Sequence, residues 1–130
     1  MTGHKHTDIG LAYLAGYIDG EGCFTVSSGT RIAVSNTYIP GLLKMQERWG
    51  GSVRRMSGTN PNARTGWQWQ LGGENCRHLL RLLLPYLKEK RDQAELVLEW
   101  FAAPPKSLTR SVAKAELSRL KRIDYDYPTS

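Results

Sequence analysis

A chain of 130 residues is long enough for one domain and too short for two separate hydrophobic cores, so we expect a single domain. Its 40% hydrophobic and 23% charged residues exclude an intrinsically disordered chain, and no apolar run approaches the roughly 20 residues of a transmembrane helix, so we expect no membrane partner. The formal net charge of +6 favours a polyanionic partner, although a generally basic surface explains the same charge.

The cysteines and the N-terminal residues indicate in which cellular compartment the protein is expected. Cys23 and Cys76 lie far apart with no pairing motif, which excludes a disulfide framework and a four-thiolate zinc site and predicts two reduced thiols. Residues 1–6 are polar and show no apolar stretch with a cleavage site, so we expect a protein that is not secreted. We expect it in the cytoplasm or with the nucleoid if it is bacterial or from a phage, and in an organelle if it is organelle-encoded.

The first predicted helix covers residues 7–20 and is apolar on most of its faces, so it requires burial on most sides. Its end is marked by Gly20 and Gly22. Residues 23–28 and 31–35 then alternate large apolar with small or polar side chains. This alternation predicts two half-buried strands that are joined by a tight turn into a hairpin.

The rest of the chain predicts a second hairpin and further helices. A helix opened by Pro40 ends at Gly50, where a left-handed C-cap fits. In the second hairpin, Trp67 and Trp69 face one way, and the glutamine that follows each of them faces the other. The remaining predicted segments are strand 52–56, a loop at 57–66, strand 67–71, helices 74–87 and 92–102, and, after a break at Pro104-Pro105, an amphipathic helix at 111–123.

This order of elements predicts an α+β fold, in which helices cover one face of four antiparallel strands. We place one domain at residues 1–103 and a C-terminal extension at residues 104–130. The helix of this extension is expected to pack as an accessory helix, either over the core or on a partner.

The uncovered face of the predicted sheet is polar and nearly free of acids. Residues 23–72 contain six basic residues and one acid, Glu47. Arginine can read guanine, glutamine can read adenine, and a two-stranded ribbon fits the DNA major groove. A solvated sheet face without any ligand has the same polar character, and strict alternation turns Arg55 inward. The candidate DNA-binding residues on these strands are Thr25, Ser27, Arg31, Ser35, Arg54, Arg55, Gln68 and Gln70.

Residues 14–22, with the sequence LAGYIDGEG, resemble the signature of the LAGLIDADG homing endonucleases. Tyr17, Gly20 and Glu21 are variants within the pattern that this family tolerates, and the resemblance covers residues 7–102. It implies the LAGLIDADG endonuclease fold, an α-β-β-α-β-β-α core with an antiparallel sheet saddle, to which we add the C-terminal helix. It also implies cleavage of double-stranded DNA, with the motif helices at the central interface.

The same segment has a physical use that does not depend on the family. Gly16 and Gly20 are four residues apart on one helix face, so another helix backbone can approach closely. Glu21 follows where unsatisfied carbonyls and the negative end of the helix dipole lie, which disfavours a lone carboxylate and favours a bound cation. Two such helix ends would offer the hard oxygen ligands that Mg²⁺ prefers. The alternative is a core helix that ends in a solvated Glu21.

The resemblance also implies a homodimer, because family members with one motif pair with themselves and this chain has one motif. We therefore expect a roughly palindromic DNA site and a shared metal site. The predicted metal ligands are Glu21 and Gly20, and the predicted ion is Mg²⁺, which Mn²⁺ or Ca²⁺ can replace for binding. The predicted dimer-interface residues are Ala12, Ala15, Gly16, Asp19 and Gly20.

Two further catalytic residues are implied by their positions. Asn36 falls where the family places a polar residue that orders water near the metals; alternatively, it caps or turns the chain before Pro40. Residues 85–94 resemble the family's stretch between the last two core helices, where Lys90 matches a lysine that stabilises charge or activates water. Lys88 is its rival and a further DNA-binding candidate, and an ordinary solvated loop is the alternative for both. Phosphate contacts are expected from Lys44, Arg48, Lys88 and Arg91.

The resulting hypothesis is a site-specific homing endonuclease that makes a divalent-metal-dependent double-strand break in a long, roughly palindromic DNA site. The family analogy adds a cut across the minor groove that leaves 3′ overhangs. The rival hypothesis is a non-cleaving binder on the same fold: an intron maturase, for which RNA would be the partner, or a DNA-binding regulator. The retained Glu21 argues against a site that has lost its chemistry.

Overall fold

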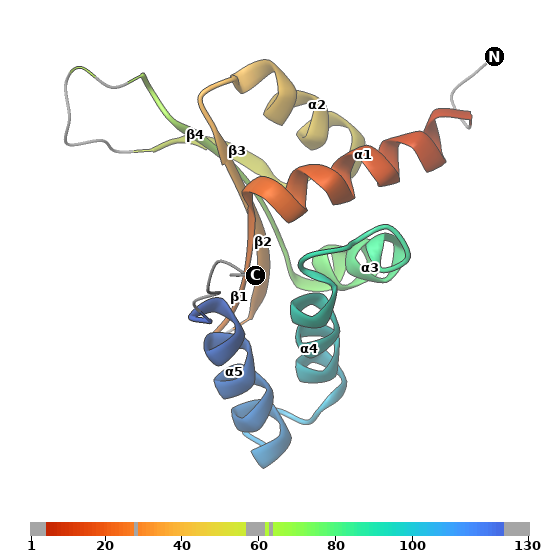
Figure 1. Cartoon of the computed structure of the whole chain (residues 1–130), viewed down its shortest axis with the longest axis vertical. Helices are drawn as coiled ribbons and strands as arrows, with labels where there is room; N and C mark the ends of the chain where they lie inside the picture. The colour runs from red at the N-terminus through yellow and green to blue at the C-terminus, as the bar shows by residue number, and fades with distance from the viewer. Residues whose placement is uncertain (1–4, 28, 57–61, 63, 124–130) are drawn as a thin grey trace, which may run out of the picture.

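The computed structural model describes residues 5–27, 29–56, 62 and 64–123. Most of the predicted loop at 57–66 and the last part of the extension, 124–130, lie outside the described residues. Helices α1 to α4 pack on one side of the sheet, and α5 lies beside α4 (Figure 1). The elements are α1 (Lys5–Glu21), β1 (Gly22–Val26), β2 (Thr30–Asn36), α2 (Ile39–Trp49), β3 (Ser52–Arg55), β4 (Trp67–Gly72), α3 (Gly73–Leu83), α4 (Arg91–Ala102) and α5 (Leu108–Lys121).

The described strands form one antiparallel sheet in the order β1-β2-β4-β3, so the two hairpins meet through β2 and β4. In this register Val34 lies opposite Trp69, and both side chains are buried against the helices. Along each of these two strands, the residues next to Val34 and Trp69 point to the other face of the sheet, because side chains alternate between the faces of a strand. The predicted α+β fold and the predicted polar face of the sheet are both confirmed.

Helix α1 is buried on one side and open on the other. Leu14, Ala15 and Ile18 are fully buried in the core, whereas Tyr13 is 60% exposed and Gly16 is exposed. Part of the apolar surface of this helix therefore stays exposed in its own protomer. None of the helices in the described part of the chain combines the length and the apolar character that crossing a bilayer requires.

Two helix boundaries differ from the sequence-based prediction by three or more positions. Helix α3 ends at Leu83, four positions before the predicted end. Leu84 still has helical dihedral angles and donates to the carbonyl oxygen of Leu80, but Pro85 has no backbone N–H with which to continue the helical hydrogen bonds. Helix α5 begins at Leu108, three positions before the predicted start. Its start is fixed by Ser107, whose hydroxyl accepts a hydrogen bond of 3.2 Å from the backbone N–H of Arg110.

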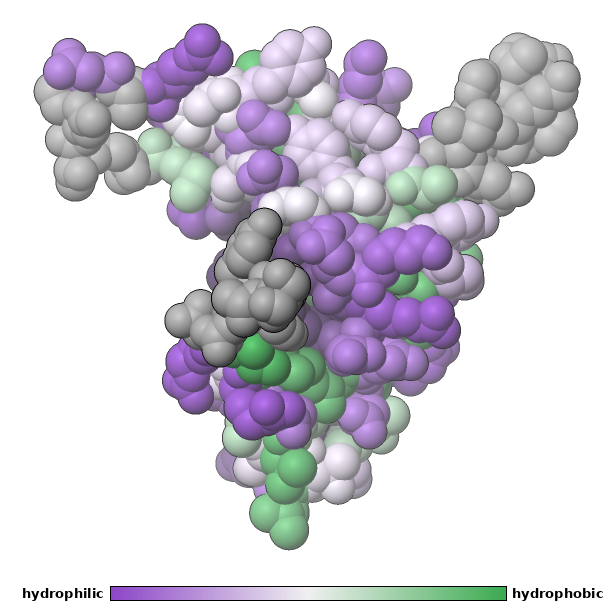
Figure 2. Space-filling view, in the orientation of Figure 1, coloured by the Kyte–Doolittle hydropathy of each residue, from purple (hydrophilic) through white to green (hydrophobic). Residues whose placement is uncertain are grey.

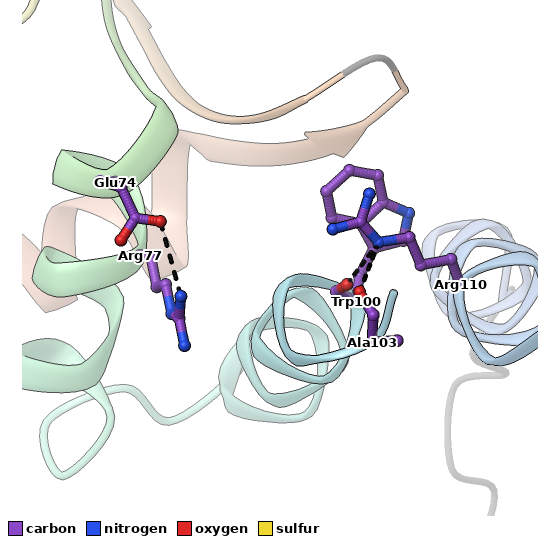
Figure 3. A network of polar contacts seen from close by, with 5 residues as sticks. All are labelled: Glu74, Arg77, Trp100, Ala103 and Arg110. Atoms are coloured by element: carbon purple, nitrogen blue, oxygen red, sulfur yellow. Dashed lines mark hydrogen bonds and ion pairs between the residues drawn. The ribbon is translucent and has the colours of Figure 1, made fainter. Parts of the chain in front are cut away.

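The C-terminal extension packs on the core of its own protomer, which decides between the two predicted locations of its helix. Ala113 and Leu117 are buried, and Arg110 lies 3.8 Å over the ring of Trp100. The Nε–H of Arg110 also donates to the carbonyl oxygens of Trp100 and Ala103, each at 3.0 Å, at the end of α4 (Figure 3). Hydrophobic side chains gather at the end of the molecule where α5 begins, and Leu108 is 79% exposed there (Figure 2).

The turn after α2 depends on a glycine, and this gives a stability prediction. Gly51 has a φ of +88°, and an added Cβ would overlap the carbonyl oxygen of Gln70. The alanine variant Gly51→Ala is therefore expected to lower the free energy of unfolding by about 2–5 kcal/mol, from backbone strain and steric overlap together. The control Gly73→Ala has a φ of +66° and open space around the Cβ, so a loss of about 1 kcal/mol is expected. Urea unfolding at one protein concentration measures both, and equal losses would contradict the packing argument.

Candidate functional site

The end of α1 brings the acidic residues of the LAGYIDGEG segment to the junction with the sheet. Glu21 is the last residue of α1 and is exposed, and β1 begins at the next residue. Because the sheet begins directly after Glu21, it fixes the position of this residue at the end of the helix. Gly20 is exposed as well, and a Cβ added there would meet no atom within 4 Å.

Asp19 joins this helix end to the turn before α4. Its Oδ2 accepts a hydrogen bond of 2.8 Å from the backbone N–H of Lys88, and its Oδ1 accepts one of 2.9 Å from the backbone N–H of Lys90. The Nζ of Lys90 in turn donates to the carbonyl oxygen of Asp19 at 2.7 Å. The ammonium group thus lies at the negative end of the α1 dipole, which favours a cation.

These contacts separate the two lysines that the sequence leaves as rivals. Lys90 is half-buried and its ammonium group is held at the end of α1. Lys88 is exposed and makes its contact with Asp19 through its backbone N–H. Of the two side chains, only that of Lys90 is held at this helix end, while the side chain of Lys88 is exposed; the catalytic and DNA-binding roles of the two lysines stay predictions.

Asn36 has two partners in the protomer. Its Oδ1 accepts a hydrogen bond of 3.0 Å from the backbone N–H of Tyr38, and its Nδ2 donates to the hydroxyl of Tyr17 on α1. The first contact is the turn-forming arrangement that the sequence offers as the alternative role. In register, Asn36 pairs with Trp67 on the helix-covered face of the sheet. Its catalytic role stays a prediction.

A hydrogen-bonded network crosses the uncovered face of the sheet. Arg31 Nη1 donates to Gln70 Oε1 at 3.2 Å, and Gln70 Nε2 donates to Gln68 Oε1. Arg54 Nη2 also donates to Gln68 Oε1, at 3.1 Å, and Gln68 Nε2 donates to the hydroxyl of Ser35 at 3.2 Å. The network joins β2, β4 and β3 into one row of oriented polar groups.

The charge of this face is positive. The described strands contain no aspartate or glutamate, while Arg31 and Arg54 are exposed on them. Each guanidinium group keeps further N–H donors beside the one that it gives to a glutamine. Thr25 pairs in register with Arg31 and lies on the same face. Such a surface can neutralise phosphates and donate to base edges.

Three of the predicted site residues do not lie where their predicted roles require: one dimer-interface candidate and two DNA-binding candidates. Ala15 is fully buried in the core of its own protomer, so its prediction as a dimer-interface residue is wrong. Arg55 pairs in register with Trp67, which puts it on the opposite face from Arg54, so it does not join the polar network. Ser27 follows the end of β1 and lines a hollow with residues of the α4–α5 segment, away from the network.

The open side of α1 is continuous with a groove toward α2. An added Cβ at Gly16 or Gly20 would meet no atom within 4 Å, so at these two positions no described residue of the protomer covers the helix. The groove has a volume of about 720 Å³, and its lining includes the exposed basic residues Lys44 and Arg48. The two predicted phosphate ligands on α2 therefore lie next to the uncovered helix face.

Metal ligands are sparse within one protomer. Across the described residues, no group of three or more histidine, cysteine, aspartate or glutamate side chains lies close enough together to hold a metal ion. Cys76 is unsuited to this role, because burial raises the pKa of its thiol to about 11. Glu21 alone gives one protomer a single exposed carboxylate at the end of α1, so a metal site there requires a second contributor.

The contacts of Asp19 with the turn before α4, and the contact of Tyr17 with Asn36, were not predicted from the sequence. Both partners of Asp19 are about 70 positions away along the chain. The signal that was present is the spacing of two acids in one helical turn, Asp19 and Glu21, which cannot both point to the same ligand.

Comparisons with known proteins agree with this geometry, although no protein-family model matches the chain. The DNA endonuclease I-CvuI of Chlorella vulgaris is 31% identical, over 82% of this chain and 73% of that endonuclease. The solved structure of I-CvuI with the I-CreI target and Mg, in which the DNA is not cleaved, has a TM-score of 0.72 at 26% identity and covers 94% of this chain and 88% of that one. The archaeal intron-encoded homing endonuclease I-Vdi141I, complexed with DNA, shares the fold with a TM-score of 0.70 at 16% identity, over 94% of this chain and 90% of that one.

Proposed function

Because the chain belongs to the LAGLIDADG homing endonuclease family, we propose that it makes a double-strand break in a specific DNA site as a homodimer. One observation carries this proposal: Glu21 and the ammonium group of Lys90 lie at the same helix end, next to an acid-free sheet face. An acidic metal ligand, a fixed cation and a surface that binds polyanions are what hydrolysis of a DNA phosphodiester requires.

The sheet face and the basic residues around it would hold the DNA. Arg31 and Arg54 would donate to base edges in the major groove, oriented by the glutamines that bond to them. Basic side chains that are exposed outside the sheet would contact phosphates, which makes the affinity dependent on salt. These residues are Lys44, Arg48, Lys88 and Arg91.

Two copies of the chain would complete the active site. The open side of α1, with Ala12, Gly16 and Gly20 exposed, can accept the same face of a second protomer at close range. The crossing would bring one Glu21 carboxylate from each protomer together with the exposed carbonyl groups at the helix ends. A two-fold dimer of this kind reads a roughly palindromic site.

The chemistry follows from these parts. Glu21 and the carbonyl oxygen of Gly20 would hold a divalent cation, which supplies a Lewis acid that makes bound water acidic; we propose Mg²⁺, and I-CvuI was solved with its target in the presence of Ca. Lys90, held by Asp19, would place its positive charge where the phosphate gains negative charge in the transition state.

A selection experiment tests this function. Randomised DNA duplexes are enriched for binding in Ca²⁺, and the enriched pool is then exposed to Mg²⁺ and its ends are sequenced. Cuts at a symmetric site support a dimeric endonuclease. Specific binding without cuts would favour a DNA-binding regulator or a maturase, of which the maturase also splices its RNA intron. No enrichment at all would overturn the proposal.

The base-reading role of Arg54 gives a separate prediction. Replacing it by alanine is expected to remove about 1–3 kcal/mol of discrimination at one position in each half-site, because its guanidinium group is the exposed donor beside Gln68. Sequencing of the duplexes that the variant selects measures this. The control Arg77→Ala removes an arginine that pairs with Glu74 on α3, away from the sheet face, and should leave the preferred sequence unchanged (Figure 3). An unchanged preference in Arg54→Ala would exclude this role.

A further inference from the structure

We propose that Asp19 is the positioning residue of Lys90, holding its ammonium group at the end of α1 beside Glu21. The inference rests on the proposed function, because it assigns a task to one residue of the same active site. It differs from the predicted place of Asp19 in the dimer interface, since both of its carboxylate oxygens are engaged inside the protomer.

Asp19 holds Lys90 at two points. The backbone N–H of Lys90 donates to the carboxylate at 2.9 Å, and the side-chain Nζ donates to the backbone carbonyl of the same aspartate at 2.7 Å. A lysine side chain has several rotatable bonds and normally samples many rotamers in water. Attachment at both ends to one residue restricts this freedom and keeps the charge at one place.

The contact also fixes the turn from which Lys90 extends. The backbone N–H of Lys88 donates to the second carboxylate oxygen at 2.8 Å, so two amides two residues apart are held by one side chain. The carbonyl oxygen of Lys90 accepts a hydrogen bond of 2.9 Å from Ala94 and so begins α4. Asp19 is half-buried, so these charge-assisted bonds are partly shielded from water.

The geometry assigns different tasks to the two acids at the end of α1. Glu21 is exposed and follows the last turn of the helix, where a ligand can reach it. Asp19 lies two positions earlier and is directed to the turn before α4. Two acids that lie two positions apart in the motif can thus serve the metal and the lysine separately.

A double-mutant cycle on the full-length protein tests this assignment. Single-turnover cleavage of the selected DNA site in Mg²⁺ is compared in the wild type, Asp19→Asn, Lys90→Met and the double variant. Lys90→Met is expected to cleave about 100-fold more slowly and Asp19→Asn about 10-fold or more, because a misplaced cation stabilises the transition state less. The double variant is expected to be no slower than Lys90→Met alone, since residues that act as a unit are not additive.

Two further measurements separate positioning from a merely structural role. DNA affinity in Ca²⁺ is expected to stay within about threefold of the wild type in all variants, because no predicted DNA contact is removed. Hydrogen exchange of the Lys88 and Lys90 amides is expected to accelerate in Asp19→Asn and to stay slow in Lys90→Met. If Asp19→Asn does not fold, Asp19→Glu, which keeps both acceptor oxygens, takes its place in the cycle.

The outcomes that overturn the inference are distinct from failure of the proposed function. Independent, multiplying effects of the two substitutions would show that Asp19 does not act through Lys90. Unchanged amide exchange in Asp19→Asn would exclude the contact itself. A wild type that binds its selected site and never cuts it in Mg²⁺ would overturn the proposed function, and this inference with it.

Discussion

The variant Glu21→Gln is expected to lose double-strand cleavage by about 1,000-fold or more while it still binds the selected DNA site. Glutamine keeps the size of the side chain and removes its charge, so the proposed cation would lose its main ligand in each protomer. Both protomers of the proposed homodimer would carry the substitution, so no intact Glu21 carboxylate would remain at the proposed interface.

Binding is expected to survive because Glu21 is exposed and supplies no predicted contact to DNA. Loss of a negative charge near the phosphates should even strengthen the affinity slightly. Cleavage is measured by single-turnover assays in Mg²⁺, and binding by titration in Ca²⁺. Both assays use the selected site.

The matched control is Glu95→Gln, which neutralises an exposed carboxylate on α4. Its cleavage rate should match that of the wild type within about twofold, since isolated surface charges contribute little. If Glu21→Gln cut within tenfold of the wild type, Glu21 would not be the metal ligand. Equal loss of binding and cleavage would instead give Glu21 a structural role.

The variant Gly16→Leu is expected to abolish the proposed homodimer and, with it, cleavage. In the protomer, a Cβ at this position meets no atom within 4 Å, so the leucine fits without strain. In a dimer whose α1 helices approach closely, the same side chain would separate the two backbones and the two Glu21 carboxylates. The substitution therefore acts on assembly and not on the fold of the protomer.

The protomer itself should become more stable. Replacing a glycine inside a helix by a better helix former contributes about 0.5–1 kcal/mol. Sedimentation or light scattering gives the oligomeric state, and thermal unfolding gives the stability. The control Ala115→Leu adds an exposed leucine on α5 and should leave both the dimer and cleavage intact. A Gly16→Leu protein that is still dimeric would exclude α1 as the interface.

The types and order of the elements, the faces of the strands and the position of the acidic motif follow from local features of the amino-acid sequence. Alternation along a strand is a local property, so Trp69 could be assigned to the buried face and Gln68 to the polar face before the structure was known. The small residues of α1 and the acid that follows them likewise lie within one short segment.

Which of these local features come into contact depends on how the elements pack against one another. The side of α1 that enters the core is set by the sheet and α3, so Ala15 is buried and Gly16 is open, although both are small. The order of the strands places Arg54 beside Gln68 and turns Arg55 to the other face. Asp19 contacts Lys90 across 71 residues, and such a contact depends on how the elements between them, β1 to α3, pack and not on local preference.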